Sequence, residues 1–123
     1  MLYPLAIEAT HTTPRVSYDA STGLCVIEGR AMPIDAGAFF EPILAWIDQY
    51  AEQPLAATKF IFRMDYFNSG ASLLVARLMY KLNQVQGASI HWHYHPDDED
   101  ILEAGHEFAR VTHVPFHFVP QPD

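Results

Sequence analysis

The sequence is nearly without cysteine, with Cys25 as the single thiol among 123 residues. One thiol excludes an intrachain disulfide and any zinc site built from several cysteines. Disulfide-free chains are typical of reducing compartments, so we expect a cytoplasmic protein.

Basic residues and long apolar runs are also scarce. Seven Lys and Arg stand against fifteen Asp and Glu, which gives a formal charge of −8. The chain therefore lacks the cationic surface by which proteins capture nucleic acid. Residues 1–8 contain neither basic residues nor an apolar run of the length that a signal peptide or a membrane span needs, and we expect no membrane insertion.

What remains has the composition of a globular domain. Half of the residues are hydrophobic and 18% are charged, far from the polar signature of disorder. A chain of this length fits one domain with a true core, and we find neither a repeat nor a linker. We therefore expect a single domain over residues 1–123.

Apolar periodicity predicts an alternation of strands and helices. Two β-rich stretches at 15–19 and 24–28 flank a polar connection that ends in Gly23, which predicts a hairpin. Further along the chain, we expect helices at 35–50, 69–86 and from about 97 to 109, and strands at 60–67, 89–95 and 114–119. Asp35 is expected to cap the first helix and Gly87 to end the second, and the apolar stripe of the first helix contains Phe39, Ile43, Trp46 and Tyr50. In the strand at 60–67, one face is expected to carry Phe60, Phe62, Met64 and Tyr66. The order β-β-α-β-α-β-α-β predicts an α/β fold, in which right-handed crossovers build a central mixed sheet with helices packed on it. This is the general shape of anti-sigma-factor-antagonist (STAS-like) domains.

One turn, Tyr66-Phe67-Asn68-Ser69-Gly70-Ala71-Ser72, joins a predicted strand to a predicted helix. Asn and Ser are favoured helix N-caps, and the sequence does not decide whether Asn68 or Ser69 caps this one. A hydroxyl at this point lies beside free backbone N–H groups, where a phosphate would be tolerated. Gly70 leaves room beside the hydroxyl for the close approach of an enzyme.

Several segments together resemble the SiaC-type family of biofilm-regulating phosphoproteins. The likeness runs from about Ile7 to Val119, and it rests on Thr12-Thr13-Pro14, Gly29-Arg30 with Pro33, Phe40…Pro42-Ile43-Leu44…Trp46, Tyr66-Phe67-Asn68-Ser69, Asp98-Glu99-Asp100, Glu103-Ala104-Gly105 and Pro115-Phe116.

The resemblance implies a regulatory protein and not an enzyme, with no cofactor. Ser69 would be phosphorylated by a Ser/Thr kinase and restored by a PP2C-like phosphatase. The unphosphorylated form would bind and activate a diguanylate cyclase, which raises cyclic-di-GMP and so acts in biofilm control. The residues expected in the switch loop, where the partner binds, are Tyr66, Phe67, Asn68, Gly70 and Ser72.

Two other functions compete with this interpretation. His91, His93 and His95 alternate along a predicted strand, an arrangement in which imidazoles hold zinc, so a metal-dependent hydrolase is one alternative. Against it, the opposite alternation would bury Ile90 and Trp92 and leave the histidines in solvent. The second alternative is an anti-sigma-factor antagonist, which shares the fold and the switch but has another partner.

Overall fold

A six-stranded sheet carries three helices in the computed structural model, which describes residues 2–122. The two end residues of the predicted domain lie outside the described part. The strands are β1 (Leu5–Ile7), β2 (Arg15–Asp19), β3 (Leu24–Ala31), β4 (Thr58–Phe67), β5 (Ala88–Tyr94) and β6 (Phe116–Pro120), and the helices are α1 (Ala36–Tyr50), α2 (Ser69–Lys81) and α3 (Glu99–Ala109), with a 3₁₀ turn, η1 (Leu82–Gln84), after α2. Within residues 2–122, no helix has both the length and the apolar character that crossing a bilayer requires.

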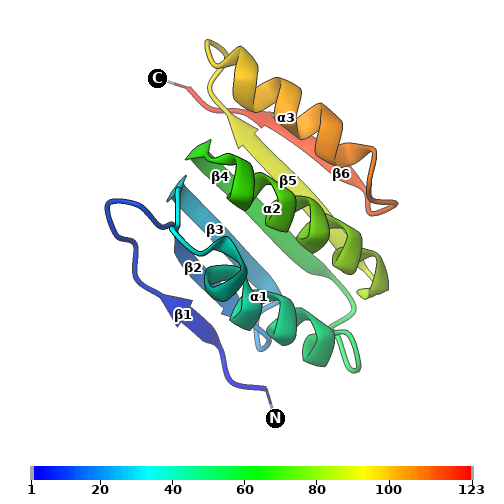
Figure 1. Ribbon diagram of the computed structural model, residues 1–123. Coiled ribbons are helices and arrows are strands. Elements are labelled where there is room, and N and C mark those ends of the chain that lie inside the picture. The colour runs from blue at the N-terminus through cyan, green and yellow to red at the C-terminus, as the bar shows by residue number, and fades with distance from the viewer. Residues whose placement is uncertain (1, 123) are drawn as a thin grey trace.

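The strands lie in the sheet in the order in which they occur in the sequence. β1, β2 and β3 are antiparallel neighbours, whereas β3 to β6 are parallel and are joined in turn by α1, α2 and α3. Successive crossovers of one hand between neighbouring strands return to the same side, so the helices form one layer, with α2 between α1 and α3 (Figure 1). The predicted α/β class and mixed sheet are confirmed, and the helices leave the other face of the sheet uncovered.

The predicted element order is wrong at its beginning, because it lacks β1. This strand has three residues and pairs with β2 from Leu5↔Tyr18 to Ile7↔Val16. Three residues are too few for an alternating pattern to stand out in a sequence. The observed order is therefore β-β-β-α-β-α-β-α-β.

The second helix ends at Lys81 and not at the predicted Gln86. Beyond it the chain tightens into η1, where the Asn83 side chain accepts hydrogen bonds from the Thr112 hydroxyl (3.0 Å) and the His113 amide (2.7 Å). Gly87 then turns the chain into β5 with φ of +83°, and a Cβ there would overlap the Ala56 carbonyl oxygen. Gly87 therefore ends the connection after η1 and not the helix, so its predicted role as the stop of the helix is wrong.

One apolar core fills the space between the sheet and the helices. In α1, the predicted stripe is confirmed, with Ile43, Trp46 and Tyr50 buried. Asp35 caps this helix as predicted, because its side chain accepts the Ala38 amide at 3.0 Å.

A β-bulge near the end of β4 corrects the predicted alternation of that strand. Met64 pairs with Gly29 and Tyr66 pairs with Arg30, so Asp65 is an extra residue on β4. An extra residue reverses the alternation of side chains beyond it. Tyr66 therefore faces the uncovered side of the sheet, although it was predicted to share a face with the buried Met64.

Cys25 lies opposite Tyr18 in the β2–β3 pair, and both are buried on the helix-facing side. Tyr18 packs edge-on against Trp46 and Phe60, with ring centroids 5.4 and 5.9 Å apart. Burial raises the pKa of the Cys25 thiol to about 12 and raises that of the Tyr18 hydroxyl well above its usual value. Cys25 is therefore an unreactive part of the core.

Candidate functional site

The start of α2 is capped by Asn68, which answers the question that the sequence left open. The Asn68 side-chain oxygen accepts the Ala71 amide at 2.9 Å, while its backbone is extended as a cap requires. Ser69 is the first helical residue. The cap and the candidate phosphoacceptor are thus two different residues.

Hydrogen bonds hold this turn to the end of the neighbouring strand. The Asn68 amide donates to the Ala31 carbonyl at 3.0 Å, and the Asn68 side-chain nitrogen donates to the Pro33 carbonyl at 3.5 Å. Ala31 also pairs with Phe67 across the β3–β4 ladder. The turn therefore sits at the carboxyl edge of two parallel strands, on a backbone that is fixed from both sides.

Ser69 has an exposed side chain, and no group within residues 2–122 hydrogen-bonds its hydroxyl. The first turn of α2 contains no acidic residue. Because the positive end of the helix dipole lies here, the site tolerates added negative charge. The geometry therefore allows Ser69 to be esterified without breaking a hydrogen bond that holds the fold.

The other residues predicted for the switch loop lie in different surroundings. Gly70 is exposed beside Ser69, and a Cβ on it would meet the Ala36 Cβ at 3.4 Å, which is close to an ordinary contact. Phe67 packs on Phe108 in the core, with ring centroids 5.8 Å apart. Ser72 is half-buried, and Tyr66 is turned to the uncovered face of the sheet. The structure thus brings together Asn68, Ser69 and Gly70, and separates Tyr66 from them.

We expect Asn68→Ala to lower the free energy of unfolding by about 1 kcal/mol, because the cap on the Ala71 amide is lost. Urea unfolding followed by circular dichroism measures the change. Asn68→Ser keeps a capping oxygen and is the matched control, which should retain most of the stability. Equal losses in the two variants would show that the cap is not what Asn68 contributes.

Exposed apolar side chains beside the turn and along α2 were not predicted from the sequence. Ile34, Leu73 and Tyr80 are large, apolar and exposed, and Leu73 and Tyr80 belong to α2 itself. The helical pattern could have predicted the two residues on α2. The buried stripe of α2 runs through Ala71, Val75 and Leu78, so apolar residues outside that stripe face outward.

The histidines lie on the uncovered face of the sheet. His91 and His93 alternate there on β5, whereas His95 lies beyond the end of that strand. The His91 ring stacks on His117 of β6 at a centroid distance of 4.8 Å, and its Nε2 is 2.9 Å from the Ser89 hydroxyl oxygen. Among the residues that the structure describes, no three His, Cys, Asp or Glu side chains are close enough to share a metal ion. The three-ligand set that the hydrolase hypothesis needs is not formed.

Positive charge surrounds these imidazoles. Burial, and next the Lys59 ammonium, lower the pKa of His91. Burial, and next the Arg63 guanidinium, lower the pKa of His93. Nearby, Glu28 is paired with Arg15 at 2.7 Å and with Arg63 at 3.6 Å. Cations this close would repel a divalent metal, which further weakens the hydrolase interpretation.

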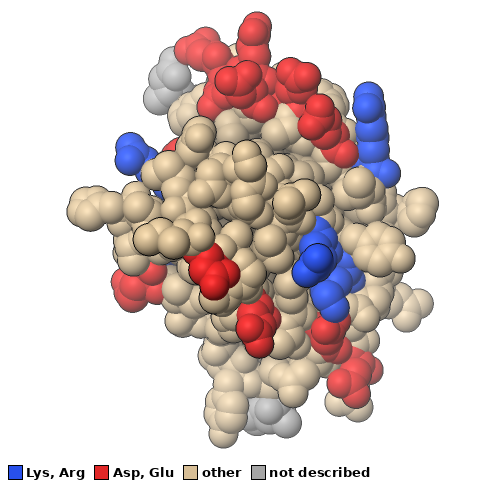
Figure 2. All heavy atoms as spheres, viewed as in Figure 1, with Lys and Arg blue, Asp and Glu red and all other residues tan. Residues whose placement is uncertain are grey.

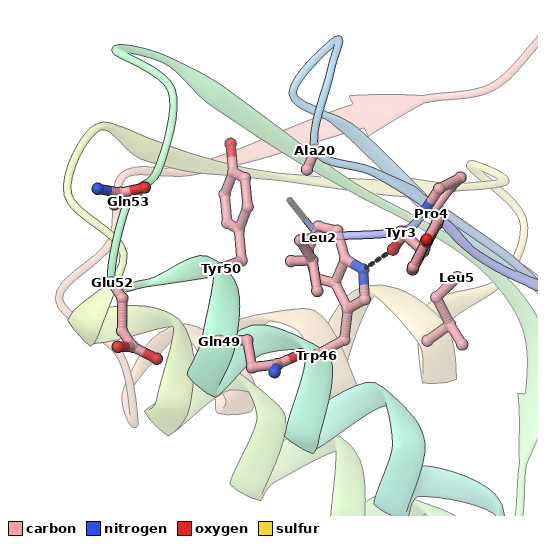
Figure 3. Close-up of a pocket in the computed structure, with 10 residues that line it drawn as sticks. All are labelled: Leu2, Tyr3, Pro4, Leu5, Ala20, Trp46, Gln49, Tyr50, Glu52 and Gln53. Carbon is pink, nitrogen blue, oxygen red and sulfur yellow. Dashed lines mark hydrogen bonds between the residues drawn. The ribbon is translucent and has the colours of Figure 1, made fainter.

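One hollow, of about 800 Å³, lies away from Ser69. It is open and sits between the end of α1 and the amino-terminal segment (Figure 3). Trp46 and Tyr50 stack on its α1 side with centroids 4.9 Å apart, and the Trp46 indole donates to the Tyr3 carbonyl at 2.9 Å. Both rings are largely buried, so this contact fastens the amino-terminal segment to the helix layer.

Comparison with known proteins bears on the family and on the fold. A sequence model of the SiaC family, described as a SiaC family regulatory phosphoprotein, matches residues 7–121. No curated protein matches the chain.

Three solved chains share the fold. Apo-SiaC from Pseudomonas aeruginosa has a TM-score of 0.86 and 21% identity, over 95% of this chain and 98% of that one. A second SiaC structure from the same organism has a TM-score of 0.88 and 20% identity, over 97% and 99%. A chain from the crystal structure of the P. aeruginosa diguanylate cyclase SiaD in complex with its activator SiaC has a TM-score of 0.88 and 21% identity, over 95% and 99%. Since the family model spans nearly the whole sequence, the chain belongs to the SiaC family of regulatory phosphoproteins.

Proposed function

We propose that this chain is a non-enzymatic, cytoplasmic switch protein with a STAS-like fold, controlled by reversible phosphorylation of Ser69. The unphosphorylated form binds and activates a diguanylate cyclase, a Ser/Thr kinase turns it off, and a PP2C-like phosphatase restores it. The observation that carries the proposal is the exposed, unbonded Ser69 hydroxyl at the start of α2, in a chain of a family of regulatory phosphoproteins. The P. aeruginosa relative is known as the activator of the cyclase SiaD, which supports the choice of partner.

The mechanism is a local change of charge on a fixed scaffold. Phosphate adds roughly −1.5 to −2 charges and three acceptor oxygens at Ser69. The helix dipole favours this charge, so the fold is retained. A partner that covers Ser69 must instead desolvate the phosphate, which opposes docking.

Intact-mass measurement tests the site assignment. The purified chain is incubated with ATP and a Ser/Thr kinase from the same organism, and we expect the mass of one phosphoryl group to be added. Ser69→Ala should remain unmodified, whereas Ser72→Ala, one turn further on and half-buried, should be modified like the wild type. Equal modification of the wild type and Ser69→Ala would place the acceptor elsewhere. No modification of the wild type by a kinase active on a control peptide would refute the switch.

A further inference from the structure

The uncovered face of the sheet carries basic side chains that the acidic composition of the chain does not suggest. Of the seven Lys and Arg residues, four stand on it: Arg15, Arg30, Lys59 and Arg63. The imidazoles described above lie on the same face. Figure 2 shows the opposite side, which the helices cover, and there acidic side chains gather along α3. The uncovered face is therefore the cationic side of an acidic protein.

Basic and imidazole side chains meet around β5. His91 pairs directly with His117 of β6 in the strand register. Besides burial and, for His93, the Arg63 guanidinium, the Lys59 ammonium lowers the pKa of both His91 and His93, so this one ammonium lies near two imidazoles. We refer to the side chains that meet here as the cationic cluster: Lys59, Arg63, His91, His93 and His117.

Ion pairing leaves part of this positive charge free. Glu28 binds Arg15 at 2.7 Å and Arg63 at 3.6 Å, so one carboxylate serves two guanidinium groups. Lys59 is exposed and forms no ion pair with any residue from 2 to 122. The cationic cluster therefore keeps an excess of positive charge even when its imidazoles are neutral.

The other carboxylates near this face are engaged elsewhere. The Asp19 side chain accepts the Ser21 amide at 2.8 Å and the Ser21 hydroxyl at 2.7 Å in the hairpin turn. Asp65 lies at the bulge of β4 and lines a small hollow together with Arg30. Neither carboxylate forms an ion pair with a side chain of the cationic cluster.

An apolar floor lies beside the cluster. Val26 and Ile61 pair across β3 and β4 and project to the uncovered face, yet they are only 7% and 8% exposed. Because the helices lie on the other side of the sheet, the stems of neighbouring long side chains must cover these two residues. Charges beside such a low-dielectric surface act more strongly on a ligand than charges surrounded by water.

We propose that the cationic cluster binds a short chain of phosphate groups, such as inorganic polyphosphate or the end of a nucleoside triphosphate. This site lies apart from Ser69, and it does not depend on the function proposed above. Lys59 and Arg63 are four residues apart on β4, about 13 Å between their Cα atoms, so an extended anion reaches both more readily than a single phosphate does. Adjacent phosphates also concentrate more charge than the spaced carboxylates of an acidic peptide.

Each group of the cluster has a defined part in this binding. The Arg63 guanidinium donates to two phosphate oxygens at once, and the Lys59 ammonium acts as a point charge. Nε2 of His91 is 2.9 Å from the Ser89 hydroxyl oxygen, which leaves Nδ1 of this ring for a ligand. An anion beside His91 and His93 favours their charged forms, so it raises the pKa values that the neighbouring cations lower.

Calorimetric titration with tripolyphosphate at neutral pH tests the proposal, and we expect a single site. Lys59→Glu should lower the affinity by roughly tenfold or more, because attraction is replaced by repulsion. Glu28→Gln should raise the affinity, because it removes the carboxylate that competes for Arg63. Arg77→Glu is the matched control, since Arg77 is an exposed residue of α2 without an ion pair among residues 2–122, and it should bind as the wild type does. Melting curves verify that each variant is folded.

Two further measurements identify the ligand. In ring-proton NMR, tripolyphosphate should raise the pKa of His91 and His93 and leave that of His106 on α3 unchanged. We expect ATP and GTP to bind as tripolyphosphate does; tighter binding of one nucleotide that is lost in Lys59→Glu would identify it as the source of the phosphate chain. Absence of binding to the folded wild type, or equal affinities of Lys59→Glu and Arg77→Glu, would overturn the site. Tighter binding of an oligoglutamate peptide than of tripolyphosphate would assign the face to an acidic protein segment and refute the phosphate ligand.

Discussion

Gly105→Ala is expected to destabilise the protein by about 2 kcal/mol, although alanine favours helices. A Cβ at Gly105 of α3 would lie 2.6 Å from Cδ1 and Nε1 of Trp92 and 2.8 Å from Cε1 of Phe118. Trp92 is buried and donates its indole N–H to the Ile101 carbonyl at 2.9 Å, so its ring has little room to move. Overpacking of this kind costs about 3 kcal/mol, against a gain of about 1 kcal/mol in helix propensity.

Urea unfolding at 25 °C measures this loss directly. In a domain of this size, a loss of about 2 kcal/mol also lowers the melting temperature by about 8 °C. Gly37→Ala is the control, since Gly37 is also helical but a Cβ there would meet only the Asp35 carboxylate oxygen, at an ordinary 3.5 Å. It should be neutral or stabilising by up to about 1 kcal/mol. Equal changes in the free energy of unfolding for the two alanine variants would mean that Gly105 of α3 is not in close contact with Trp92.

Phosphorylation of Ser69 is expected to reduce stimulation of the cyclase by roughly tenfold or more while the protein stays folded. The loss follows from the desolvation of nearly two charges beneath a docked partner. Stability is retained because Asn68 continues to cap α2 and the helix start favours negative charge. The assay compares cyclic-di-GMP formed per unit time with the unmodified chain and with the stoichiometrically phosphorylated chain.

Variants with an added carboxylate test how the loss of cyclase stimulation depends on the amount and position of the charge. Ser69→Asp carries about one charge, so its activation should fall between that of the unmodified and the phosphorylated chain. Ser72→Asp places the same charge one turn further on, at a half-buried position, and should disturb activation less. Full stimulation by the phosphorylated chain would contradict a block by charge, and a large fall in its melting temperature would indicate that the switch works by unfolding.

Long periodic segments of this chain are readable from the sequence alone. The stripe of α1, its Asp35 cap and the alternation of helices with parallel strands follow from patterns that local physics imposes. Short features, and features without a periodic pattern, cannot be predicted in this way. β1 has too few residues to alternate, and the bulge at Asp65 comes from pairing between strands and leaves no mark of its own in β4.

The residues of the candidate site also differ in how far the sequence predicts them. Ser69 is predicted as a site only through a resemblance to a family, and it stays a prediction. The choice of Asn68 as the cap depends on a backbone conformation that the sequence does not specify. His117 is a residue near the histidine pair that the sequence did not single out. It stacks on His91 because β5 and β6 are parallel neighbours. This contact joins residues that are distant in the sequence, and the pattern of one strand cannot predict it.

If Ser69 is the phosphoacceptor, as proposed, its separation from the cap residue Asn68 has a consequence for the cell. If Ser69 itself closed the helix, every round of modification would loosen the domain and expose it to quality-control proteases. With Asn68 holding α2, both forms of the protein are equally well folded, and we expect them to have the same lifetime. In that scheme the signal changes the ratio of two forms of the protein while its total amount stays constant, and the proposed phosphatase can reverse the change without new protein synthesis.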